Sequence, residues 1–257
     1  MDQEPLRFPS DAEDIFRKLE SLWNFVDSKI SRQTIDHKND LRLLILASVT
    51  AATHRLIRGV IAQINSGSVD GMDILTRSLI EGMINIKYII EDNTQMRARA
   101  YIVADYSDRI KSLKRLIPLL EQEKAPGMAT VTDDKHYKNL QSQLEKELLE
   151  FQEEYGKDNL IWPSLEQRAQ ISNSEELYAT AIWLLSLDSH LTARGLDRFM
   201  KEKEDGGVII DLGQDLSRVG MHLRTIYITY IALLNECCTY FNLPKREDLE
   251  PFDIIPR

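Results

Sequence analysis

The chain has 257 residues, of which 43% are hydrophobic and 28% are charged, and this composition excludes a disordered chain. A chain of this length can bury a substantial core. The formal net charge of −9 argues against a broad DNA-binding surface or binding to an anionic membrane, because an acidic surface repels phosphate groups at long range.

The spacing of apolar residues predicts an all-α fold, a multi-helix bundle. Nearly every patterned segment has apolar residues three and four positions apart, which is typical of helices. The first helix is expected over residues 11–29, with Ser10 as its cap. Residues 1–40 then comprise this N-terminal helix and its connection.

Residues 41–93 are predicted to form a central apolar helical hairpin. Its first helix covers residues 41–65 and ends at Ser66 and Gly67, because glycine takes up the left-handed conformation that closes a helix. The second helix follows over about residues 69–91. Both helices are apolar almost all round, so we expect them at the centre of the bundle.

Residues 94–156 are predicted to form an outer charged helical hairpin. Its helices are expected over residues 94–122 and 133–155, and Pro126 and Gly127 separate them. A single stripe of leucines is the main apolar anchor of the second helix. This hairpin is the segment that we expect to dock a protein partner or to mediate formation of a homodimer.

Residues 157–241 are expected to form the C-terminal helices, and residues 242–257 a tail. Capping-box spacing after Ser164 and after Ser172 predicts two helix starts, and the second helix is expected to run from Glu175 to about Lys201. The segment GGVIIDLGQD suggests a short turn or hairpin, and the last helix is expected over residues 216–241. Residues 1–257 are thus interpreted as a single domain.

Arg77 and Glu81 interrupt the apolar segment RSLIEGMINIKY of the central hairpin. At positions i and i+4 of a helix, their side chains meet on one face, and a hydrogen-bonded pair makes a buried charge tolerable. One interpretation is a structural ion pair that fixes the register of neighbouring helices. The other is a site in which Arg77 binds an anion and Glu81 orients it or a partner histidine.

Ser186 and His190 form a second polar cluster, in the segment LLSLDSH, on the inward face of a predicted helix. A histidine in such a place is either a hydrogen-bonded core residue or a group that exchanges protons. The candidate catalytic residues are therefore His190, Arg77, Glu81 and Ser186.

These segments resemble the bacterial domain-of-unknown-function family numbered 5677. RSLIEGMINIKYI, then WPSLEQRA, then a tyrosine and LSLDSH occur in the family's order over roughly residues 41–198. The matching positions are Arg77, Glu81, Tyr88, Trp162, Tyr178, Ser186 and His190. The resemblance implies a helical bundle and brings no settled activity.

The arrangement is more loosely similar to HEPN-type domains, many of which are metal-independent ribonucleases in toxin–antitoxin and phage-defence systems. That similarity implies a histidine as general acid or base on a ribose 2′-hydroxyl and an arginine that stabilises phosphoryl charge. Arg32 and His37 match the spacing of the HEPN motif, but they lie in a predicted connection, and a chance match is equally open. Arg194 follows His190, which reverses the motif's order.

Two functions remain open at this stage. One is a HEPN-like protein that binds or cleaves RNA at a local site; the other is a noncatalytic interaction or dimerisation module whose inner polar residues are structural. We expect no metal and no cofactor, because no metal-ligand spacing or glycine-rich phosphate loop occurs. The adjacent Cys237 and Cys238 and the lack of a signal pattern or membrane-length apolar run predict a cytoplasmic protein with reduced thiols.

Overall fold

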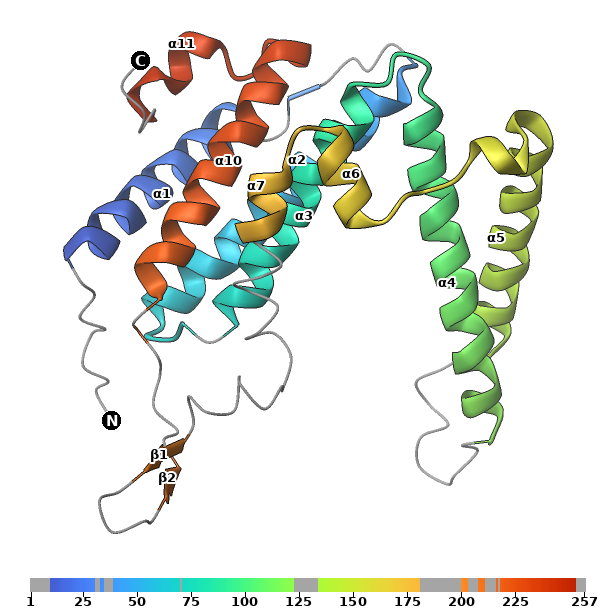
Figure 1. Ribbon diagram of the computed structural model, residues 1–257, viewed down its shortest axis with the longest axis horizontal. Coiled ribbons are helices and arrows are strands. Elements are labelled where there is room, and N and C mark those ends of the chain that lie inside the picture. Colours follow the sequence, from blue (N-terminus) through green and yellow to red (C-terminus); the bar gives the residue numbers. More distant parts are fainter. Residues whose placement is uncertain are drawn as a thin grey trace. The chain divides into compact units, whose positions relative to one another are not determined.

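The computed structural model describes residues 10–30, 33–34, 39–69, 71–122, 134–180, 200–202, 208–210, 216 and 218–252. Within this part of the chain nearly all regular structure is helical, and the predicted all-α multi-helix bundle is confirmed (Figure 1). The chain divides into two compact units, residues 1–88 with 165–257 and residues 89–164. That the whole chain forms a single domain stays a prediction.

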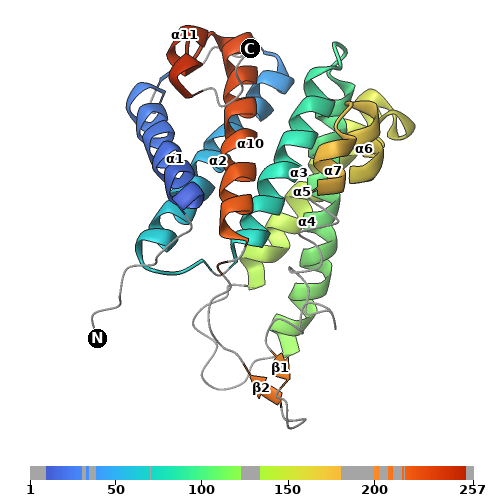
Figure 2. The ribbon, with the colours of Figure 1, turned by 60° about the vertical axis from the view of Figure 1, so that its left-hand side comes forward.

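The first unit is built around three long helices that lie side by side in both views (Figures 1 and 2). They are α1 (Ser10–Lys29), α2 (Leu41–Asn65) and α10 (Val219–Phe241). The same unit contains most of α3 (Met72–Ile90) and the short helices α6 (Leu165–Ile171), α7 (Glu175–Tyr178), α11 (Arg246–Leu249) and η4 (Glu250–Phe252). Leu22, Ile57 and Tyr227 are fully buried in its core, and each such side chain contributes about 1.5–3 kcal/mol.

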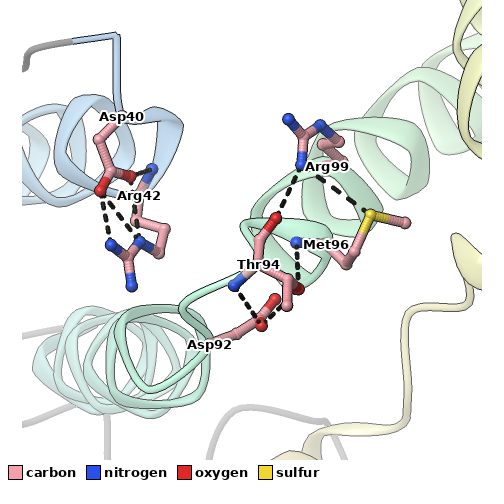
Figure 3. A network of polar contacts seen from close by, with 6 residues as sticks. All are labelled: Asp40, Arg42, Asp92, Thr94, Met96 and Arg99. Carbon is pink, nitrogen blue, oxygen red and sulfur yellow. Dashed lines mark hydrogen bonds and ion pairs between the residues drawn. The ribbon is translucent and has the colours of Figure 1, made fainter.

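Helix α2 begins at Leu41 because Asp40 caps it. The Asp40 carboxylate accepts hydrogen bonds from the Arg42 backbone N–H at 2.9 Å and from Arg42 Nη2 at 2.6 Å (Figure 3). The bond from the Arg42 side chain is the largest influence that lowers the pKa of Asp40. The helix ends at Asn65, as predicted, and Gly67 follows with a φ of 82°.

Among the described helices, α2 is long and apolar enough by length and composition to cross a membrane. Core helices of folded proteins pass the same test, and a third of its most apolar window is buried in this structure. Ile57, Val60 and Ile64 of α2 pack with α1 and α10 in one core. One face of the helix is therefore packed in the bundle core.

The second unit contains the predicted charged hairpin. Its elements are α4 (Met96–Gln122), α5 (Asp134–Tyr155) and the short η1 (Lys157–Asn159). Helices α4 and α5 pack together through a core of Ile110, Leu113, Ile117 and Leu144, and Lys114 Nζ lies 2.9 Å from Glu145 Oε1. The hairpin is confirmed, whereas its outer position in the bundle stays a prediction.

Helix α4 begins two residues later than predicted because Asp92 and Thr94 form the turn before it. Asp92 Oδ1 accepts hydrogen bonds from the Thr94 N–H at 2.9 Å and the Thr94 hydroxyl at 2.6 Å (Figure 3). Asp92 Oδ2 accepts one from the Arg97 N–H. Burial is the largest single influence on the pKa of Asp92 and raises it, but these hydrogen bonds together hold the pKa below its usual value.

Two details of the predicted C-terminal helices are wrong. Helix α7 begins at Glu175 as predicted, but the residue before it is Ser174 and not Ser172, whose hydroxyl donates to the backbone carbonyl of Arg168 at 2.9 Å. The predicted helix from Glu175 does not reach Lys201, since Met200–Glu202 is strand β1 and pairs antiparallel with β2 (Val208–Ile210). The β-branched residues of β2 favour this short hairpin. Residues 181–199 lie outside the described part.

Candidate functional site

Helix α3 places Arg77 and Glu81 one turn apart, and they form the predicted pair. Arg77 Nε donates a hydrogen bond to Glu81 Oε1 at 2.7 Å. The helical period puts Arg77, Ser78, Glu81 and Asn85 on one stripe. The remaining faces are buried at Leu79, Ile80, Met83, Ile84 and Ile86. The pair therefore lies at the polar edge of an otherwise apolar helix.

The pair is half-buried rather than sealed in the interior. The Arg77 side chain is 29% exposed and that of Glu81 35%. Asn85, one turn further on, is also half-buried, and its Oδ1 atom is covered without a hydrogen-bond partner in the described part of the structure. Solvent reaches Arg77 and Glu81 because the apolar faces of α3, rather than the polar one, pack into the core.

Helix α7 packs against the helix that carries the pair. Ile80 and Ile84 of α3 form a small core with Ala169, and the cluster is completed by Leu177 and Tyr178 of α7, among others. Ser186 and His190 lie outside the described residues, as do Arg32 and His37. The structure therefore pairs Arg77 with Glu81. It also packs α7, which ends at Tyr178 and precedes Ser186 in the chain, against α3.

Arg168 is a buried charged residue that our sequence reasoning did not select. It lies on α6 beside Ala169, and only 8% of it is exposed. Leu165, Arg168 and Ala169 are three and four positions apart, so the helical period alone places Arg168 on the apolar face of α6. A buried arginine must be compensated by its surroundings, and this face of α6 packs toward α3.

A second polar network, also missed in the sequence, joins three helices of the first unit. His54 of α2 has Nδ1 2.7 Å from the Tyr230 hydroxyl of α10 and Nε2 3.4 Å from Asp27 Oδ1 of α1. The imidazole stacks on the Trp23 ring, with a centroid distance of 4.9 Å and an interplanar angle of 3°. A histidine inside the apolar helix 41–65 was the signal that could have found it.

The environment keeps this imidazole neutral. Burial lowers the pKa of His54, Asp27 opposes that change, and the charge of Arg58 adds to it. Burial also raises the pKa of the Tyr230 hydroxyl. Because a carboxylate only accepts, the neutral ring must carry its proton on Nε2 toward Asp27, and Nδ1 must accept a hydrogen bond from the Tyr230 hydroxyl. Tyr230 has no exposed surface, so the network orients His54 and does not deliver a proton to a ligand through the tyrosine.

Among the described residues, no group of three or more histidine, cysteine or acidic side chains is arranged to hold a metal ion. The two thiols are free, and burial raises the pKa of Cys237 to about 11. This thiol is therefore protonated at neutral pH and is not a nucleophile.

The sequence was compared with protein families, curated proteins and solved structures. The profile of a family of unknown function, DUF5677, matches residues 43–208. No curated protein and no solved structure matches the chain. The matched range contains Arg77, Glu81, Tyr178, Ser186 and His190, the positions on which the resemblance was based. Since the match covers more than half of the sequence, the chain belongs to the DUF5677 family.

Proposed function

We propose that the protein is a HEPN-like helical protein that binds or cleaves RNA in a toxin-like or phage-defence system. Arg77 contacts the phosphate, Glu81 orients the guanidinium, and His190 is the general acid or base, with Ser186 beside it. The observation that carries this proposal is the exposure of the pair, 29% for Arg77 and 35% for Glu81. A site that acts on RNA must be reached from solvent, and a pair that only fixes helix register has no such need.

The packing of α7 supports the second half of the site. Tyr178 at the end of α7 packs in the same cluster as Ile80 and Ile84 of α3. Ile80 precedes Glu81 in the sequence, and Ile84 lies one turn after it. Tyr178 also precedes Ser186 and His190 by only a short stretch of sequence, which is why we keep all four residues in one proposed site.

The proposed cleavage of RNA uses no metal ion in its proton transfers. The ribose 2′-oxygen attacks the adjacent phosphorus while His190 takes the hydroxyl proton, and the bond from phosphorus to the 5′-oxygen breaks as that oxygen takes a proton from water. The products are a 2′,3′-cyclic phosphate and a 5′-hydroxyl end. The guanidinium of Arg77, held by Glu81, stabilises the additional charge on the phosphoryl oxygens.

The proposal is tested by expressing the natural protein and the variants His190→Ala and Arg77→Ala in cells and measuring growth arrest and RNA decay. The natural protein should arrest growth and degrade RNA, and both variants should lose these effects by at least about two orders of magnitude in rate. His136→Ala is the matched control, because His136 is exposed on α5 in the other unit. It should behave as the natural protein does.

Purified protein should also cleave RNA in the presence of a chelator and leave the two ends named above. If the natural protein neither binds nor degrades RNA, the proposal is wrong. If His190→Ala degrades RNA at the natural rate while folded, His190 is not catalytic. Binding that does not weaken with salt would also contradict a phosphate-contacting arginine.

A second function is favoured by the hairpin of α4 and α5. It has its own core, yet Leu119 and Leu149 are 55% and 57% exposed. Helix α4 has six basic against three acidic residues and α5 three basic against six acidic ones. Two copies of such a hairpin can pair α4 of one with α5 of the other, so the occupant we propose for this surface is a second copy of the chain.

Light scattering during gel filtration distinguishes this alternative. The natural protein should be a dimer, and the double variant Leu119→Ser with Leu149→Ser should be a monomer with an unchanged helical spectrum. A natural protein that is monomeric at tens of micromolar concentration would remove the dimerisation proposal and leave the RNA proposal untouched.

A further inference from the structure

The first unit contains a pocket that is separate from the Arg77–Glu81 pair. It has a volume of about 340 Å³, at the lower end of the range of small-molecule sites. Helices α1, α2 and α10, together with the residues that follow α1 and α10, form its walls. The apolar lining consists of Val26, Ile30, Ala47, Ala51, Phe241 and Leu243.

The polar groups deep in this pocket are already satisfied by protein partners. The Thr50 hydroxyl donates to the Leu46 carbonyl at 2.8 Å and lies 3.1 Å from Cys237 Sγ. Both ring nitrogens of His54 have partners, Tyr230 and Asp27. A ligand group at these walls gains no strong hydrogen bond, so the interior favours an apolar body.

The mouth of the pocket is different because it carries a positive charge. Arg55 lines the pocket and is exposed, and it forms no ion pair with any carboxylate of the described residues. Gln33, also exposed, lines the pocket and offers an amide N–H donor. None of the described lining residues is acidic.

We propose that this pocket binds a small monocarboxylic acid with an apolar body. The apolar part occupies the space between α1, α2 and α10, and the carboxylate is held at the mouth by Arg55 and Gln33. One guanidinium and one amide match the two oxygens of a carboxylate. A phosphate dianion would leave charge and acceptors unmatched with so few donors. This proposal does not depend on the RNA proposal, which uses other residues.

Isothermal titration calorimetry of the full chain with octanoate tests the proposal. Octanoate should bind with one-to-one stoichiometry. Octanol has the same apolar chain without the charge, and inorganic phosphate has charge without the chain. Both should bind at least roughly tenfold more weakly than octanoate, because a hydrogen bond to a charged group contributes about a factor of ten or more.

Three variants separate the charge from the cavity. Arg55→Gln removes the charge at the mouth and should weaken octanoate binding roughly tenfold. Arg58→Gln is the matched control, an exposed arginine one turn further along α2 that does not line the pocket, and its affinity should stay within about twofold. Ala51→Phe fills the pocket from its exposed side and should abolish binding. Thermal unfolding of each variant establishes that it is folded.

The proposal is overturned if the natural protein shows no saturable binding of octanoate. It is also overturned if Arg55→Gln and Arg58→Gln have equal effects, or if a folded Ala51→Phe variant binds octanoate with unchanged affinity. Tighter binding of phosphate than of octanoate would show an anion site and not the carboxylate pocket proposed.

Discussion

The bond between Arg77 and Glu81 permits a quantitative test of how this part of α3 is solvated. The test is a double-mutant cycle with Arg77→Ala, Glu81→Ala and the double variant, which isolates the interaction between the two side chains from their other contacts. The hydrogen bond is short, 2.7 Å, but the side chains are 29% and 35% exposed. Solvent at this exposure screens most of the Coulomb attraction.

We expect a coupling free energy of about 0.5–1 kcal/mol, at the upper end for exposed helical pairs. A sealed pair would behave differently, since removal of one partner would orphan a buried charge and cost about 3–5 kcal/mol. Glu13 and Arg17 provide a control pair with the same spacing on α1, and their side chains are 48% and 72% exposed. That pair should show a coupling of no more than about 0.5 kcal/mol.

The assay is urea unfolding followed by circular dichroism, with the free energy of unfolding taken from the midpoint and the slope. In concentrated salt the coupling should fall, because screening shortens the range of the charges to about 3 Å at 1 M. A coupling above about 2 kcal/mol that does not respond to salt would refute the half-buried description. A modest cost also means that Arg77→Ala remains folded, so its loss of RNA decay would report on chemistry and not on stability.

Three further predictions concern the stability of the first unit. Tyr230→Phe removes the partner 2.7 Å from His54 Nδ1 and should lower the free energy of unfolding by about 1–3 kcal/mol in urea titrations; no loss would mean that Nδ1 is not desolvated. Burial lowers the pKa of His54, so the unfolded chain takes up the proton first and stability should fall as the pH drops below about 6.5. The difference in stability between the natural protein and His54→Gln, measured from pH 8 to pH 5, should therefore shrink as the pH falls, and a constant difference would contradict this. Gly59→Ala should raise stability by about 0.5–1 kcal/mol, since an added methyl group meets nothing within 4 Å, whereas Gly71→Ala should lower it because φ is 78° at Gly71; thermal unfolding compares the two.

Local pattern was enough to predict the helices of this protein and some of their ends. The end of α2 at Asn65 was predicted from Gly67, which acts through the backbone conformation within a few residues. The start of α4 was less predictable, because a turn built by the Asp92 and Thr94 side chains delays the helix to Met96. Such a turn competes with the first helical turn for the same N–H groups.

The exposure of Arg77 and Glu81 was the part of the site that periodicity could have corrected. The segment is rich in apolar residues, and that richness suggested burial on every side. The helical period nevertheless collects Arg77, Ser78, Glu81 and Asn85 on one stripe that begins near the exposed Ile74. Assigning each residue to a face of the helix, instead of counting the apolar residues of the segment, predicts this polar edge.

The network of Asp27, His54 and Tyr230 was not predictable in the same way. Each residue comes from a different helix, and the largest separation along the chain is 203 positions, from Asp27 to Tyr230. Periodicity assigns a residue to a face of its own helix but does not say which helix packs there. The pairing of α1 with α2 and α10 is a property of the assembled core.

The two proposed sites are expected to act independently, and the reason lies in how α2 and α3 meet. A methyl group added at Gly82 of α3 would lie 3.5 Å from Val49 Cγ1 of α2, so the two helices approach closely at these residues. Gly82 follows Glu81 in the sequence, and Val49 precedes Thr50. Coupling between sites requires an element with two alternative arrangements that each ligand favours differently. This contact is between packed apolar groups, and neither site shares a residue with the other. Arg55→Gln should therefore leave RNA decay unchanged, and Arg77→Ala should leave octanoate affinity within about twofold. If octanoate changes the rate of RNA decay in the natural protein but not in Arg55→Gln, the two sites are coupled, and α2 transmits the effect of one ligand to the other site.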